Sequence, residues 1–179
     1  MTRSVPALSV ADADHGVLAR LRTVHDADPD AVVVASRALG SALTYRALVA
    51  EAAAVLGTVR AAAAPAGAPV ALLQPHAPSA VSALLGVIAS GHPVVVLDPR
   101  TPPARLRMFV ERSGAALVLA HAKTMDAAAQ LGVPVHQAAA AQLGVPVHRS
   151  DGGTASAGGA SAEEVAAFWA SPVDVEAPA

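Results

Sequence analysis

Asp98 and Arg105 are the charged residues whose positions could do chemistry. Both lie in "VVVLDPRTPPARL", where an apolar run stops at Asp-Pro and a proline-rich bend leads to an arginine. Ligands often bind at the carboxyl ends of parallel strands, which is where Asp98 is expected to lie. The alternative is structural: the Asp98 carboxylate organises the turn before the next helix, and Arg105 forms an ion pair or anchors a loop. The structural interpretation is favoured for both residues.

The other reactive residue types give weaker indications. His136 and His148 are two of seven histidines, and none is spaced on a helix to share a metal ion with another histidine or a carboxylate. The glycine-rich stretch 152–159 follows no convincing strand and has no lysine behind it, which favours a plain linker over a phosphate-binding loop. The absence of cysteine excludes disulfides, thiolate metal sites and cysteine nucleophiles.

Sequence motifs for catalysis are absent. The chain contains no G-x-G-x-x-G after a strand, no G-x-x-x-x-G-K-[ST], no G-x-S-x-G and no H-E-x-x-H. We therefore expect it to contribute no catalytic, cofactor-binding or metal-ligating residue. Phe168 and Trp169 are interpreted as a small apolar anchor for a terminal helix, in preference to a ligand-binding box.

Composition and charge narrow the class of protein. A net charge of −2 with a single lysine, Lys123, argues against nucleic acid or an anionic membrane surface as an obligate partner. The charge-free stretch 61–97 is interrupted by prolines, and its longest proline-free apolar piece, 79–91, is shorter than the ~20 residues that span a bilayer. The first residues lack the apolar core of a signal peptide. We expect a soluble, cytoplasmic protein.

The first elements that must position these residues are a helix, a hairpin and a long helix. Apolar spacing predicts a short helix from about His15 to Val24. Strands follow at 31–36 and 41–44, and Thr44 is expected to cap a helix over 45–62.

Next comes a strand–helix–strand–helix–strand alternation. We predict strands at 70–74, 93–98 and 115–120, with helices over 79–90 and 102–114 between them. Ser79 and Thr101 are the expected N-caps of the two helices, and Gly114 ends the second. The strands are continuous apolar runs, which is typical of strands buried on both faces. The predicted fold class is therefore α/β, with a doubly wound, mostly parallel sheet and flanking helices.

The last third of the chain contains a duplication. "AAAQLGVPVH" occurs at 127–136 and again at 139–148. One copy is expected to occupy a sheet position and the other to bulge out or form an edge. Residues 149–162 read as a flexible linker, and Ser161 with Glu164 forms an S-x-x-E capping box. The expected organisation is a leader over 1–14, a folded unit over 15–148, the linker over 149–162, and a short helix with an extended tail over 163–179.

The stretch "LLGVIASGHPVVVLDPRTPPARLRMFVERSGAALVLA" resembles the early core of adenylate-forming (AMP-binding) enzymes, and most of all the adenylation domains of nonribosomal peptide synthetases. That family carries a segment of the type L-K-A-G-x-x-Y-V-P-L-D-P-x-x-P-x-x-R-L, then a helix ending D-S-G-A. The matching residues are Gly91, Leu97, Asp98, Pro99, Pro102, Arg105, Leu106, Ser113, Gly114 and Ala115. Upstream, "LTYRAL" resembles the family's L-T-Y-x-E-L helix start. The resemblance covers residues 15–135.

Departures from the family pattern leave the subfamily open. Ala47 replaces the usual acid, Ala89 the usual lysine, Val94 the usual tyrosine and Val96 the usual proline. The resemblance implies amino-acid adenylation or the chemistry of a related acyl or aryl acid ligase.

The resemblance also implies what this chain lacks. In the family, a later Ser/Thr/Gly-rich loop ending in P-K-G holds ATP, further motifs bind the nucleotide and magnesium, and a lysine in a C-terminal domain contacts the acyl-adenylate. Lys123 is not a candidate for that lysine. The chain is thus expected to be a truncated first subdomain, inactive alone and binding no cofactor, although the complete enzyme uses ATP and magnesium. Its expected partners are a second chain carrying the rest of the domain, or a carrier protein. The alternative is a non-catalytic protein-interaction module derived from an adenylation domain.

Overall fold

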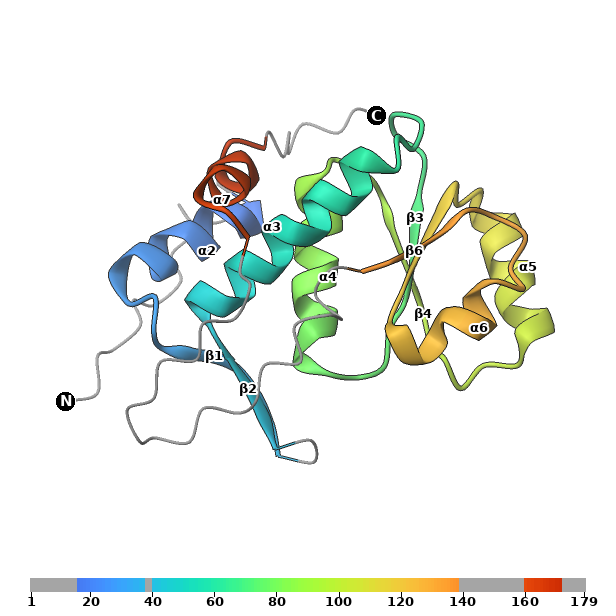
Figure 1. Ribbon diagram of the computed structural model, residues 1–179, viewed down its shortest axis with the longest axis horizontal. Coiled ribbons are helices and arrows are strands. Elements are labelled where there is room, and N and C mark those ends of the chain that lie inside the picture. Colours follow the sequence, from blue (N-terminus) through green and yellow to red (C-terminus); the bar gives the residue numbers. More distant parts are fainter. Residues whose placement is uncertain (1–15, 38–39, 139–159, 172–179) are drawn as a thin grey trace.

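A parallel four-stranded sheet in the order β4-β3-β5-β6 is the centre of the computed structural model, which describes residues 16–37, 40–138 and 160–171 (Figure 1). The strands are β3 (Val70–Leu73), β4 (Val94–Leu97), β5 (Leu117–Ala120) and β6 (Val135–Gln137). Both β4 and β5 pair in parallel with β3, so Val70 lies opposite Val94 on one side and Leu117 on the other. The chain moves from β3 to one neighbour and then crosses to the other side. This is the predicted doubly wound arrangement.

Helices cover both faces of this sheet (Figure 1). Helices α3 (Tyr45–Ala61) and α4 (Pro78–Ala89) lie on one face, and α5 (Pro103–Ser113) and α6 (Met125–Ala128) lie on the other. Alternate side chains of β3 and β5 point to opposite faces and all are buried, as predicted. None of the described helices is long and apolar enough to cross a bilayer.

Strand β4 departs from the prediction of burial on both faces. Its Val96 side chain is 71% exposed, whereas Leu97 is buried. The reason is non-local: β4 lies at the edge of the sheet, a position that an apolar run alone does not reveal.

An antiparallel hairpin leads into α3. Helix α2 (Gly16–Ala27) is followed by β1 (Val32–Ser36) and β2 (Ser41–Thr44), which pair with each other. The predicted cap is confirmed, because the Thr44 hydroxyl oxygen accepts a hydrogen bond from the Ala47 amide at 3.2 Å. The hairpin therefore continues into α3 without a loop.

Two other predicted caps are wrong. The N-cap of α4 is Ala77 and that of α5 is Pro102, in place of Ser79 and Thr101, and neither helix has a side-chain cap. Each helix instead has a proline in its first turn, where a missing N–H leaves no hydrogen bond unmade and the fixed φ suits the helix. The end of α5 is as predicted, since Gly114 closes it in the left-handed conformation with φ 67°.

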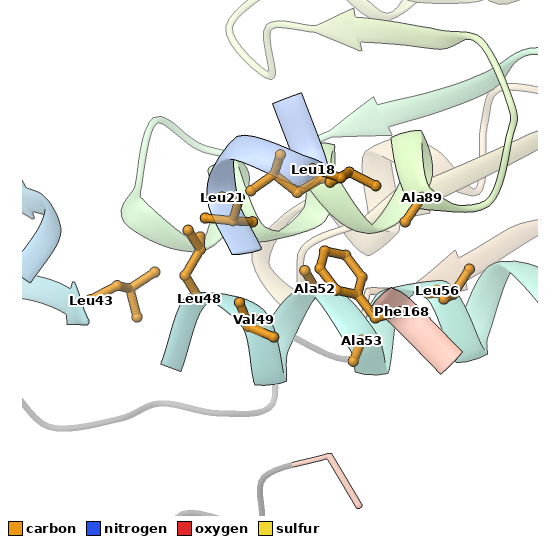
Figure 2. Close-up of a cluster of buried hydrophobic side chains, with 11 residues drawn as sticks. Leu18, Leu21, Leu43, Leu48, Val49, Ala52, Ala53, Leu56, Ala89 and Phe168 are labelled. Atoms are coloured by element: carbon orange, nitrogen blue, oxygen red, sulfur yellow. The ribbon is translucent and has the colours of Figure 1, made fainter. Parts of the chain in front are cut away.

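The terminal helix α7 (Ala162–Trp169) returns to pack on α2 and α3. The predicted capping box is present: the Glu164 amide donates to the Ser161 hydroxyl at 3.2 Å, and the Ser161 amide donates to the Glu164 carboxylate at 2.7 Å. Phe168 is fully buried among side chains of α2, α3 and α4 (Figure 2). The ring of Trp169 lies against those of His25 and Phe168. The predicted apolar anchor is confirmed.

The first copy of the duplicated segment occupies the other edge of the sheet. Residues 127–136 run from α6 into β6, with Leu131 buried, and Arg107 of α5 donates to the Gln130 carbonyl at 3.0 Å. The second copy, 139–148, and residues 149–159 of the predicted linker lie outside the described residues. The last linker positions belong to the cap and first turn of α7.

Helices α3 and α4 cross in very close contact at Gly86. A Cβ atom at this position would lie 2.6 Å from the Ala52 carbonyl oxygen and 2.6 Å from the Val55 Cβ. The first of these neighbours is a backbone atom and the second is the branching carbon of a valine side chain, so neither can move aside easily. The crossing distance therefore depends on glycine.

We predict that Gly86→Ala destabilises the chain by about 1–3 kcal/mol, the usual cost of overpacking a core. Gly57→Ala, on α3, is the matched control, because the nearest atom to its added Cβ is a Glu164 carboxylate oxygen at 3.6 Å. The control should be neutral or stabilising by up to ~1 kcal/mol from helix propensity. Urea unfolding followed by circular dichroism measures both. Equal stability of the two variants would contradict the close crossing.

A buried carboxyl group lies in the same helix pair. Glu51 of α3 is 3% exposed, and its carboxylate accepts a hydrogen bond of 2.6 Å from the Ser82 hydroxyl of α4. Burial is the main cause that raises the pKa of Glu51 above its usual value of 4.5, and the Ser82 hydrogen bond only partly opposes it. The charged form is therefore less favourable in the folded chain than in the unfolded one.

We predict that this carboxyl makes stability depend on pH. Well below pH 4.5 the group is protonated in both the folded and the unfolded state, so it adds no pH dependence to the stability. As pH rises through the folded-state pKa, the group ionises inside the core and folding stability falls. Glu51→Gln should remove this dependence, so the stability advantage of the variant should grow from pH 4 towards neutral pH. Urea midpoints measured in parallel test this, and a difference that does not change with pH would contradict it.

Candidate functional site

An apolar groove of about 320 Å³ opens at the carboxyl ends of β3 and β4, and we call it the β4 groove. Strand β3 supplies Leu72, helix α4 supplies Ala80, Val81 and Leu84, and strand β4 supplies Val96 and Leu97. The polar residues that line it are Gln74, His76 and Asp98. It lies at the edge of the sheet where doubly wound proteins bind ligands.

Asp98 organises the turn that leaves β4. Its carboxylate accepts the Arg100 amide at 2.9 Å and the Arg100 guanidinium at 2.7 Å, while the Asp98 carbonyl accepts the Thr101 amide. The hydrogen bonds from the Arg100 side chain, and then from its amide, lower the pKa of Asp98 to about 2. The predicted structural role is confirmed, and the carboxylate is already engaged by an arginine.

Neither Arg105 nor Lys123 forms an ion pair with an acidic group in the part of the chain that the structure describes. The Arg105 guanidinium lies over the Phe109 ring, 5.5 Å from its centroid, so a ring contact takes the place of the predicted ion pair or loop anchor. Lys123 belongs to a short 3-10 turn, η1 (Ala122–Thr124), between β5 and α6, as expected of a scaffold residue. Its amide donates to the His121 ring nitrogen at 3.0 Å.

The junction between β3 and β5 is closed by hydrogen bonds. The Thr124 hydroxyl lies 2.7 Å from the Leu73 carbonyl oxygen and 3.0 Å from that of His121. Burial, and then the Lys123 charge, lowers the pKa of His121. The hydrogen bonds of the Thr124 hydroxyl connect the carboxyl ends of β3 and β5.

Gln74 is the residue that the sequence interpretation missed. It follows β3 directly, is 6% exposed, and its amide nitrogen has no hydrogen-bond partner among the described residues. Its only sequence signal is a polar residue directly after the buried run "VALL". Buried polar groups are normally paired, so this donor marks a place where the described residues do not complete the packing.

The described histidines do not gather into a metal site. The His92 ring nitrogen lies 2.9 Å from the Ala68 carbonyl oxygen, and His136 is exposed on β6, while His148 lies outside the described residues. No group of three or more metal-ligating side chains occurs in the described parts of the chain. The described residues that line the β4 groove include no serine, threonine, tyrosine or lysine.

The family model described as "AMP-binding enzyme" matches residues 21–179. This chain belongs to the AMP-binding enzyme family. The resemblance to the N-terminal part of an adenylate-forming enzyme, most like a nonribosomal peptide synthetase adenylation domain, is confirmed. A search of curated proteins finds no match.

Solved structures agree with this membership. A holo four-domain nonribosomal peptide synthetase bound to AMP and glycine is 26% identical with a TM-score of 0.62, over 70% of this chain and 9% of that one. IdnL7 is 29% identical with a TM-score of 0.58, over 68% of this chain and 25% of that one. VinN in complex with 3-methylaspartate shares the fold at 21% identity and a TM-score of 0.60, over 68% of this chain and 34% of that one. This member of the AMP-binding family therefore spans between 9% and 34% of the length of these proteins.

We predict that the Asp98 carboxyl titrates near pH 2 in the folded chain and that Arg100→Ala raises its pKa towards 3.8. Because the pKa is lowered by folding, the turn is stabilised above pH 3.8 and loses this contribution as pH falls towards 2. Carboxyl carbon chemical shifts measured against pH report the value. Arg105→Ala is the control, since Arg105 contacts Phe109, and the Asp98 titration should not move in it. An unchanged titration in Arg100→Ala would contradict the assigned cause.

Proposed function

We propose that this chain is the first structural unit of an AMP-forming ligase that activates a carboxylic or amino acid with ATP. The acyl group then passes to a carrier-protein thiol in nonribosomal peptide or related natural-product biosynthesis. The family match over residues 21–179 carries the proposal. Neighbours at 26% identity, one of them a nonribosomal peptide synthetase bound to AMP and glycine, support an amino-acid substrate. The proposal places the chain in the cytoplasm, where ATP is available.

In this proposal the chain contributes a platform and other polypeptide holds the nucleotide. The described residues offer no fit for magnesium–ATP at the carboxyl edge of the sheet, because the Asp98 carboxylate is already paired with Arg100. The groove beside it is walled by aliphatic side chains, which suit packing better than phosphate binding. We therefore assign no step of the reaction to residues of this chain.

The test is ATP–pyrophosphate exchange by the purified 179-residue chain with a panel of amino, aryl and acyl acids. We expect no exchange above the enzyme-free blank and no saturable heat on titration with magnesium–ATP, while a complete adenylation domain serves as the positive control. Exchange or saturable binding by the chain alone would overturn the division of labour.

A second arm supplies the missing part. The remainder of an adenylation domain, expressed as a separate chain beginning with its phosphate-binding loop, should co-purify with this chain and restore exchange. Failure to associate would disfavour the idea that two chains together form the enzyme.

The second candidate function is a non-catalytic protein-interaction module derived from an adenylation domain. The packing of α7 favours this candidate. Helix α7 covers the outer side of α3 and buries Phe168 completely, and an independently folding module needs its apolar surfaces covered in this way. Sedimentation and thermal unfolding separate the two. A stable monomer with cooperative unfolding favours the module, and a molten or aggregating preparation favours the ligase unit.

A further inference from the structure

We propose that the outer edge of β4 and the β4 groove form the docking site for one extended strand of polypeptide from the rest of an adenylation domain. The incoming strand pairs with the backbone of β4, places an apolar side chain in the groove and presents an oxygen atom to the amide nitrogen of Gln74. The inference rests on the proposed function, because it locates the contact between this chain and the polypeptide that completes the enzyme.

The two edges of the parallel sheet are built differently. Strand β6 is only three residues long, follows Pro134 and exposes His136, which are ordinary protections against pairing with another strand. Strand β4 is "VVVL", with no charge, proline or bulge in it, and no described strand pairs with its outer side. An unprotected apolar edge is a ready template for a further strand.

The groove beside this edge continues the same apolar surface. Val96, exposed over 71% of its area, is both a β4 residue and a wall of the groove. Opposite it stand Val81 and Leu84 of α4. A strand added to β4 would direct alternate side chains to this face, so one of them would enter the groove and cover Val96.

Gln74 supplies the independent polar observation. Gln74 is more than nine-tenths buried and lines the groove. Its side-chain amide nitrogen has no hydrogen-bond partner among the described residues. Leaving a buried donor unpaired costs free energy. A carbonyl or carboxylate oxygen of the occupant would satisfy it.

Two observations identify the segment that would occupy the groove: the chemistry of the residues that line it, and the length of the similar solved structures that this chain does not cover. Among the described residues that line the groove, the only acidic group is Asp98, and it is paired with Arg100, so a neutral apolar segment fits better than a charged ligand. Helix α7 packs on α2 and α3 and supplies no wall of the groove. The chain spans 9–34% of the solved neighbours described above, so most of a complete family member is polypeptide available to dock.

The first experiment uses a synthetic peptide of alternating valine and threonine, about six residues long like an average strand. It is titrated into the isotope-labelled 179-residue chain. We expect the backbone amide signals of Val94–Leu97 and the side-chain amide signals of Gln74 to shift together with one dissociation constant. The same peptide with methylated backbone nitrogens should not bind, because it lacks donors for β4. Shifts that are absent, lie elsewhere, or also occur with the methylated peptide would overturn the proposal.

Variants of the chain distinguish specific docking at the β4 groove from nonspecific hydrophobic binding. Val96→Glu should weaken peptide binding by about tenfold or more, because the added charge would be buried. Val17→Glu is the matched control, since Val17 is 53% exposed on α2 and lines no part of the groove. Gln74→Leu should stabilise the free chain, by removing an unpaired donor, and yet weaken binding. A merely structural Gln74 would instead lose stability on substitution, which would contradict its assigned role.

Two further outcomes identify the occupant. When the remainder of an adenylation domain co-purifies with this chain, Val96→Glu should abolish the association and Val17→Glu should retain it. If the unmodified chain forms dimers that Val96→Glu dissociates, the occupant is a second copy and the proposal is overturned. Exchange activity by the chain alone would refute the proposed division of function and leave the peptide titration to be judged by itself.

Discussion

The contact between α3 and α4 at Gly86 is the constraint on which the other layers depend. The backbone of α4 lies against the Ala52 carbonyl and the Val55 side chain, so the two helices form one slab. One side of this slab covers β3 and β5, and the other side receives α2 and α7. Bringing helices so close also buries polar groups between them, which is why the Glu51 carboxyl must be held by the Ser82 hydroxyl inside the core.

Burial is uneven across the central sheet. The inner strands β3 and β5 are covered on both faces by helices of this chain. Val96 of β4, in contrast, is exposed beside a groove that contains the Gln74 amide nitrogen, which has no hydrogen-bond partner among the described residues. Strands β3, β4 and β5 have similar apolar compositions, so the difference in their burial reflects their positions in the sheet. For this member of the AMP-binding family, we interpret the exposed edge as the place where packing continues into further polypeptide.

Features set by a few neighbouring residues were predictable from the sequence, and those set by sheet order were not. Thr44, Gly114 and the Ser161–Glu164 capping box act within one helical turn, so their residue types suffice. Ser79 and Thr101 failed because a proline at the start of each helix took precedence over a polar cap. Asp98 was interpreted correctly from its place after a strand. Gln74 and the β4 groove escaped notice because an apolar run does not reveal which strand lies at an edge.

The seat of Phe168 has a consequence for how the chain is made. Its walls come from helices near the amino-terminal end, and Arg60 of α3 donates to the Ser171 hydroxyl 111 positions later. On the ribosome, α2 and α3 are synthesised well before α7. The apolar surface of these two helices that contacts Phe168 is therefore exposed to solvent until α7 is made. A nascent chain therefore exposes the apolar surface that receives Phe168 until α7 leaves the exit tunnel, and exposed apolar surface of this kind promotes aggregation.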